Sequence, residues 1–345
     1  MSLLIIVMGG AAIAADEHTP PAAAAAGNPA LVLQGHADLP GYTGDFDHLA
    51  ADVSANRLYV AAEDHGTLEV FDLNTGKHLR TVKGFETPHS IFPMPREHQV
   101  LVTDGSETVK RLDDRTFATV GTIKLHPGAD SIGFDGATGH LFIVTGGKDV
   151  KLKDSWLEEI VPQTGKVVGN VHIDAEHVEA LAVEQHGPRI FINITDKNEV
   201  DVIDKHSLAI VARWPIHEAK QNALAALDEH THRLFIVARD PGRMIVLNSD
   251  TGATLASFEA PGHVDGEVFD AANRRVYVPG GSGWIGVYQE VDADHFAELP
   301  RVTSADGAKT VVLVEHLHRL YLAVSPGERH SGAGVLWFDV APAAH

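Results

Sequence analysis

The sequence contains no cysteine, which excludes a disulfide framework and any metal site built on thiolates. Positive charge is also scarce, because 27 lysines and arginines stand against 47 aspartates and glutamates, giving a net charge of −20. Nucleic-acid binding depends on cationic side chains that displace counterions from phosphates, so we expect no nucleic-acid partner. Histidine, by contrast, is abundant, with 22 copies.

Three motif classes are missing as well. The sequence has no Gly-Lys-Ser/Thr phosphate loop, no Gly-x-Ser-x-Gly nucleophile elbow and no His-Glu-x-x-His zinc helix. No nucleotide or flavin cofactor motif is found either. Any chemistry must therefore come from residues that the fold brings together.

No apolar run is long enough to span a membrane, which takes about 20 residues. The run from Leu3 to Ala14 ends in Ala12-Ile13-Ala14, a small-x-small cleavage pattern, although a basic segment before it is lacking. We expect residues 1–15 to be the remnant of a signal peptide and residues 16–29 to be a Pro/Ala-rich linker. The protein is then periplasmic or secreted.

The rest of the chain repeats one unit seven times. Each unit contains a short apolar strand centred on a large residue, and these residues are Tyr59, Leu101, Phe142, Phe191, Phe235, Tyr277 and Tyr321. Their spacings of 42, 41, 49, 44, 42 and 44 residues leave room for four short strands per unit. Such a period predicts an all-β, seven-bladed β-propeller over residues 30–340, with residues 341–345 as a tail.

We name the four strands of a blade a to d, from the central channel outward. The last unit supplies only three strands, the third being Val335 to Asp339, while Ala30 to Gln34 forms an isolated strand before the first unit. We expect this N-terminal strand to complete the last blade, because an open seam would expose unpaired strand edges. The spacing of 49 places an insertion in blade three, around Lys148 to Trp156.

The motifs Arg57-Leu58-Tyr59-Val60, Gly66 to Asp72 and Thr75-Gly76-Lys77 resemble the YVTN-repeat, surface-layer-type propeller family of exported bacterial proteins. That family includes lactonase-like and lyase-like enzymes as well as surface and binding proteins, so the resemblance implies the fold and not an activity. The Thr-Asn that usually follows Tyr-Val is replaced here, for instance by Ala61-Ala62.

The starts of the a strands and the b–c turns gather at one mouth of a propeller's axis. Counting back twelve positions from each strand-b residue gives Asp47, His89, Asp130, Glu179, Ala223, Asp265 and Lys309. Positions one or two residues away add His48, His177, Asn222 and His263. Residues in the b–c turns, Glu63-Asp64-His65 and Asp104, are expected to extend an acidic rim.

One interpretation of this set is a metal site. His48, His89, His177 and His263 would converge on one cation, with Asp130, Glu179 and Asp265 as ligands or as acceptors that orient the imidazoles. Imidazole with carboxylate suits zinc, copper, iron or nickel. The alternative is a water-filled polar channel in which Lys309 offsets the acids.

The remaining candidates are ligand-binding residues. Asp47 and Asn222 belong to the same mouth, where Arg239 and Lys309 are able to bind a carboxylate or phosphate group. Arg239 could equally form an ion pair with Asp240 or another acid.

These observations predict an exported binding protein whose axial mouth takes a divalent metal ion or a small molecule. One alternative is a metal-dependent enzyme (an oxidoreductase, a lyase or a lactonase-like hydrolase) that uses the same site. Another is a non-catalytic scaffold that presents a propeller face to a protein partner.

Overall fold

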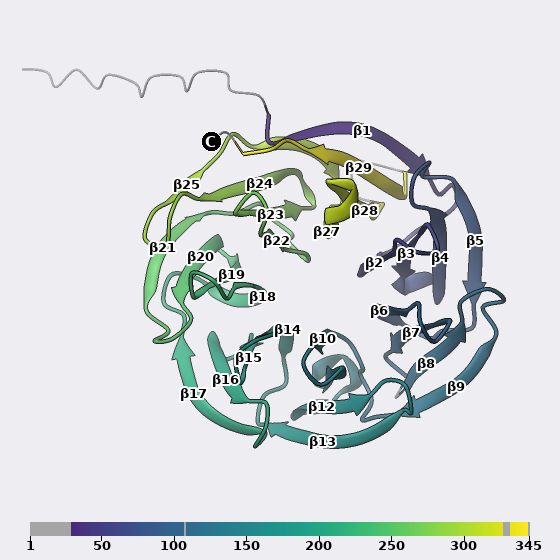
Figure 1. The fold of residues 1–345 in the computed structure, drawn as a ribbon, viewed down its shortest axis with the longest axis horizontal. Coiled ribbons are helices and arrows are strands. Elements are labelled where there is room, and N and C mark those ends of the chain that lie inside the picture. The colour runs from purple at the N-terminus through teal and green to yellow at the C-terminus, as the bar shows by residue number, and fades with distance from the viewer. Residues whose placement is uncertain (1–28, 107, 327–331, 344–345) are drawn as a thin grey trace, which may run out of the picture.

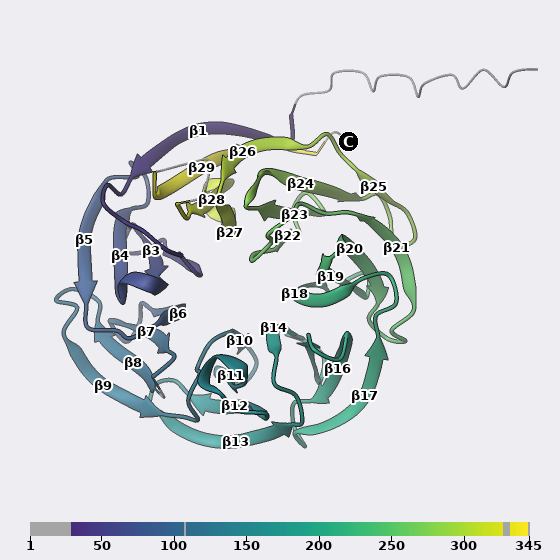
Figure 2. The same cartoon turned by 180° about the vertical axis from the view of Figure 1, so that it is seen from behind.

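The computed structural model describes residues 29–106, 108–326 and 332–343, which form seven antiparallel sheets around a central axis (Figures 1 and 2). The predicted signal-peptide remnant, residues 1–15, and all of the predicted linker except Pro29 lie outside these ranges. No helix in the described ranges is long and apolar enough to cross a membrane.

The first three blades follow one another along the chain, each with its strands in sequence order from axis to rim. Blade one contains β2 (Leu49–Asp52), β3 (Arg57–Ala62), β4 (Thr67–Asp72) and β5 (His78–Lys83). Blade two contains β6 (Pro88–Met94), β7 (Gln99–Asp104), β8 (Thr108–Asp113) and β9 (Thr119–Lys124). Blade three contains β10 (Ile132–Asp135), β11 (His140–Gly146), β12 (Ser155–Val161) and β13 (Lys166–Ile173).

The next three blades repeat this order. Blade four contains β14 (Val178–Val183), β15 (Arg189–Ile194), β16 (Glu199–Asp204) and β17 (Ala209–Pro215). Blade five contains β18 (Lys220–Asp228), β19 (Arg233–Asp240), β20 (Gly242–Asn248) and β21 (Thr254–Glu259). Blade six contains β22 (Val268–Asp270), β23 (Arg275–Gly280), β24 (Ser282–Glu290) and β25 (Phe296–Glu298), and β26 (Val302–Asp306) also pairs with β24.

Blade seven closes the ring with both ends of the described chain. Its sheet contains β27 (Ala308–Val314), β28 (Arg319–Val324), β29 (Gly334–Val340) and β1 (Leu31–Asp38). The strands β1 and β29 run antiparallel, with Leu31 opposite Val340, and lie together at the rim in Figure 1. The predicted seven-bladed propeller closed by an N-terminal strand is therefore confirmed.

The core lies between the blades, because each sheet turns its two faces toward its two neighbours. On β3, Leu58 and Val60 pack with blade seven, whereas Tyr59 and Ala61 pack with blade two. This alternation follows from the two-residue period of a strand. Because both faces of the sheet are buried against neighbouring blades, the b strands are continuous apolar runs and do not alternate between polar and apolar residues.

A β-bulge occurs where the channel strands enter the ring. The pairing shifts by one residue near the start of β6, β14, β18 and β27. In blade one, Ala61 donates to the carbonyl of His48 and accepts from the amide of Asp47, so two residues oppose one. Bulges redirect side chains locally, and here they occur in the register of the predicted site.

Three short 3-10 helices interrupt the turns: η1 (Glu63–His65), η2 (Lys148–Val150) and η3 (Glu315–Leu317). Helix η1 follows β3 at the b–c turn of blade one. Helix η2 belongs to the predicted insertion of blade three. Both helices supply side chains to the axial mouth.

Candidate functional site

The predicted register positions meet at the axis. A cavity of about 200 Å³ is lined by Asp47, His48, Glu63, His89, Asp130, Ser131, Asp149, Glu179, Ala180, Leu224 and Asp265. These residues come from blades one to six and are separated by up to 218 positions in the sequence (265 − 47). The mouth is therefore a shared surface that closure of the ring creates.

Asp47 is the centre of one half of this mouth. Its Oδ2 lies 2.7 Å from His89 Nδ1, and its Oδ1 lies 3.5 Å from His48 Nε2. Asp47, Glu63 and His89 each offer a ligand atom within 4.8 Å of the others, and so do Asp47, His48 and Asp130. Two donors bound to one zinc ion at about 2.1 Å lie at most about 4.2 Å apart. Small side-chain rotations would therefore bring either trio onto one ion.

Protonation in this half reflects crowded charge. Burial raises the pKa of Asp130 to about 6, with His89 opposing and Asp47 adding to the rise. Burial and the nearby Asp47 likewise raise the pKa of Glu63 to about 7. Burial works against a charged His89, but Asp130 and Asp47 overcome it and raise the pKa of that imidazole to about 10.

Asp47 itself behaves in the opposite way. Burial would raise the pKa of Asp47, but His48 and His89 hold it well below its usual range. Asp47 is thus ionised across the physiological range, with an imidazole on each side. We call Asp47, His48, Glu63, His89 and Asp130 the open cluster, because no lysine or arginine of the described residues forms an ion pair with any of them.

The other half of the mouth is a chain of ion pairs. Arg239 donates through Nη1 to Glu179 at 2.7 Å and through Nη2 to Asp265 at 2.8 Å. Lys309 donates to Asp265 at 2.8 Å and to Asp45 at 2.6 Å. Of the two predicted roles for Arg239, the structure shows an ion pair, made with Glu179 and Asp265 rather than with Asp240. We call Asp45, Glu179, Arg239, Asp265 and Lys309 the paired cluster.

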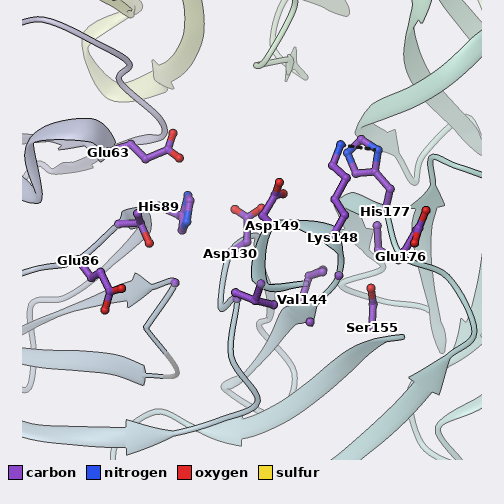
Figure 3. A pocket seen from close by; sticks show the side chains of 17 residues that line it. Glu63, Glu86, His89, Asp130, Val144, Lys148, Asp149, Ser155, Glu176 and His177 are labelled. Carbon is purple, nitrogen blue, oxygen red and sulfur yellow. Dashed lines mark hydrogen bonds between the residues drawn. The ribbon is translucent and has the colours of Figure 1, made fainter. Parts of the chain in front are cut away.

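His177 and His263 join neither trio around Asp47. His177 Nε2 lies 2.8 Å from Glu179 Oε1, and its Nδ1 lies 3.1 Å from Lys148 Nζ (Figure 3). His263 is exposed in the loop before Val264, with a left-handed backbone at φ 56°. The predicted convergence of four histidines is therefore reduced to two, His48 and His89.

Two further predicted positions are structural in character. Asn222 is fully buried and donates to Asn193 Oδ1 at 2.7 Å and to the Glu199 carbonyl at 2.9 Å, which ties blade five to blade four. Asp104 is also fully buried and pairs with Lys110 at 2.7 Å instead of extending the rim.

A second cavity of about 240 Å³ adjoins the open cluster. Glu63, His89, Asp130 and Asp149 line both cavities, and Lys148 of η2 also lines the second one (Figure 3). The sequence indicated the insertion but not the direction of Asp149, because no other blade contains an equivalent. Asp45 was missed for the same reason, since it precedes the first repeat.

Comparison with known proteins extends to the fold alone. No protein-family model and no curated protein matches the sequence, so the YVTN-repeat resemblance stays a prediction from motifs. A chain in a crystal structure of the mitotic checkpoint complex superposes with a TM-score of 0.73 at 14% identity, covering 96% of this chain and all of that one. This similarity supports the propeller architecture and carries no information on ligands.

Proposed function

We propose that this protein binds one divalent transition-metal ion at the axial mouth, with Asp47 as the shared ligand. The observation that carries the proposal is the pair of overlapping trios, one with Glu63 and His89 and one with His48 and Asp130. An ion held by either trio would keep the remaining residues of the open cluster as hydrogen-bonding neighbours, which orient ligands in metal sites.

The electrostatic reason for a cation is that three carboxylates crowd the open cluster, where the groups paired with Asp47 are imidazoles. Three carboxylates, Asp47, Glu63 and Asp130, face one narrow cavity, while Arg239 and Lys309 are already engaged by the paired cluster. Like charges at such a site disfavour ionisation, and a divalent cation removes that penalty. Metal binding would therefore release protons from Glu63, Asp130 and His89.

The donor types narrow the choice of metal. The imidazole that each trio adds to its carboxylates favours zinc, copper, iron or nickel over calcium and magnesium, which prefer oxygen ligands alone. These ligand types do not distinguish between zinc, copper, iron and nickel. We also propose export of the protein, on the cleavage pattern within residues 1–15.

A metal-dependent enzyme is the second candidate, and the adjoining cavity is the observation that favours it. Three protein ligands leave coordination positions for water or substrate, and the 240 Å³ cavity beside Glu63, His89 and Asp130 has room for a small molecule. A bound metal would supply Lewis acidity there. With the ion held by Asp47, His48 and Asp130, the chain's own contribution would be an acid, Glu63, whose pKa of about 7 suits proton transfer near neutral pH.

Elemental analysis and calorimetry of untagged protein prepared without chelators test the binding proposal. We expect about one equivalent of a first-row metal ion, lost in Asp47→Asn and in the double variant His48→Ala, His89→Ala. His263→Gln is the matched control, because it removes an imidazole at the same mouth but outside the trios. Metal-free protein that shows no heat with zinc, copper, iron or nickel would contradict the proposal.

A further inference from the structure

The molecule contains another cavity, away from the axis, of about 380 Å³. It lies between blades three and four, whose outer strands β13 and β17 form part of its wall at the rim seen in Figure 1. Its lining consists of His172, Ile173, Asp174, Ile194, Lys197, Asp201, Ile210 and Arg213. None of these residues lines the axial cavity, so any ligand here is independent of the proposed metal.

Asp201 on β16 differs from its equivalents in the other blades. The residue that pairs with the position after the strand-b aromatic is Glu69 in blade one, Glu158 in blade three and Asp201 in blade four. Glu69 accepts hydrogen bonds from Tyr42 and Thr81, and Glu158 accepts them from Thr145 and the His126 amide. Blades one and three therefore place an acid at this position and surround it with donors, whereas the other blades apart from blade four have no acid there.

Blade four keeps the acid but supplies no close donor to its buried Oδ1. Asp201 is 2% exposed, and its Oδ1 is closed to solvent and receives no hydrogen bond. The nearest cation is Arg213, whose Nε lies 3.5 Å from that oxygen and whose side chain is largely exposed. Burial raises the pKa of Asp201 to about 6, with Arg213 opposing the rise. A buried carboxylate whose cation lies 3.5 Å away is incompletely paired, which is costly to a fold. A donor group on a ligand in the adjoining cavity would complete it.

The cavity presents three kinds of wall. Asp201 is the buried acidic wall, while Arg213 and Lys197 are the cationic one beside it, and the exposed Asp174 pairs with Lys197 at 3.7 Å. The third wall is apolar and contains Ile173, Ile194 and Ile210. A simple anion would face Asp201, and a simple amine would face Arg213, so neither matches both charged walls.

We propose that this cavity binds an aliphatic α-amino acid. Its ammonium group donates to Asp201, its carboxylate accepts from Arg213 and Lys197, and its side chain packs on the three isoleucines. The ammonium and carboxylate of an α-amino acid are joined through a single carbon, as close together as the acid and the guanidinium that would receive them. A guanidinium is suited to a carboxylate because its N–H groups form a planar fork.

Titration calorimetry of the full chain with L-leucine, L-isoleucine and L-valine tests the proposal. We expect saturable binding of at least one of these amino acids with one site per chain. The two leucine analogues that each lack one charge, 4-methylpentanoate and 3-methylbutylamine, should bind at least about tenfold more weakly, since each leaves a charged wall unmatched. Absence of saturable heat with all three amino acids would overturn the proposal.

Variants assign the binding to the two walls. Asp201→Asn changes the charge with little change of shape and should weaken leucine binding at least about tenfold while the protein stays folded. Arg213→Gln should weaken leucine and leave 3-methylbutylamine unaffected. Asp47→Asn at the axial mouth is the matched control and should bind leucine like the parent. Unchanged leucine affinity in Asp201→Asn, with a folded protein by thermal melting, would overturn the assignment.

Discussion

On the side of the mouth formed mainly by blades four to seven, Glu179, Asp265 and Asp45 each have a cation beside them. Arg239 bridges Glu179 and Asp265, and Lys309 bridges Asp265 and Asp45. On the side formed by blades one to three, Asp47 has imidazoles beside it, and Asp130 and Glu63 have no lysine or arginine partner among the described residues. Six of the seven repeats place an ionisable group at the same register, on both sides of the mouth.

The comparison shows that acids gathered around the axis need something to offset their mutual repulsion, either a neighbouring positive charge or a bound proton. In the paired cluster the compensating positive charges are Arg239 and Lys309, two side chains of the chain itself. In the open cluster burial and the nearby Asp47 raise the pKa of Asp130 to about 6 and that of Glu63 to about 7, so these two acids give up their protons less readily than usual. A divalent ion would do for the open cluster what Arg239 does for the paired cluster.

The largest effect is expected from opening the ring, since both clusters exist only while blade seven is closed. Leu31 on β1 is 2% exposed and packs in the core between blades six and seven. Leu31→Asp should lower the free energy of unfolding by more than about 3 kcal/mol, through lost burial and an unpaired buried carboxyl. Leu33→Asp on the same strand is the control, because Leu33 is 56% exposed. Equal melting temperatures for the two variants would refute the role of β1.

The next largest loss of stability is expected when Arg239, which bridges two acids of the paired cluster, is removed. Arg239→Met should cost about 3 kcal/mol, because it leaves two largely buried carboxylates, Glu179 and Asp265, without their shared partner. The loss should shrink as the pH falls and these acids become protonated. Chemical denaturation at neutral and acidic pH measures it, with the exposed Arg96→Met as control. A cost that does not change with pH would show that Arg239 acts through packing alone.

The smallest expected effects are on the free energy of unfolding when Asp130 or Glu179 is replaced by its amide. The two residues occupy equivalent positions in their blades, yet the changes should have opposite signs. The folded-state pKa of Asp130 is raised above its ordinary value, so ionisation costs stability, and that cost appears as the pH rises through about 6. In metal-free protein Asp130→Asn should therefore stabilise by about 1 kcal/mol above pH 6, and this advantage should vanish below the ordinary range of an aspartate.

Glu179 provides the counterpart. Burial would raise the pKa of Glu179, but His177 and Arg239 lower it, so its charge contributes stability that is lost as the pH falls through the folded-state value. Glu179→Gln should destabilise by about 1 to 2 kcal/mol at neutral pH and have little effect in acid. Thermal melts of both variants across this pH range measure the contrast. The same sign for both variants would remove the distinction between the clusters.

Much of this site follows from the sequence because a propeller converts equal register into equal position around an axis. Counting back from the strand-b residues brought Asp47, His89, Asp130 and Glu179 to one cavity, as the structure shows. The count cannot show that a bulge turns His48 toward the same cavity next to Asp47.

Other features depend on information that no repeat carries. Asp149 belongs to an insertion present only in blade three, and Asp45 precedes the first blade, so neither has an equivalent to count from. His263 has a nearly matching register but a left-handed backbone that leaves it exposed. The choice of Arg239 for Glu179, 60 positions away, is made by side-chain reach across the mouth.

Anomalous diffraction from crystals of the protein grown with zinc or nickel, collected at the absorption edge of the metal, tests the metal assignment most directly. We predict one strong peak on the axial side of blades one to three, within bonding distance of Asp47 and of His89 or His48. A peak only at the rim, or none at the axis under saturating metal, would contradict the account.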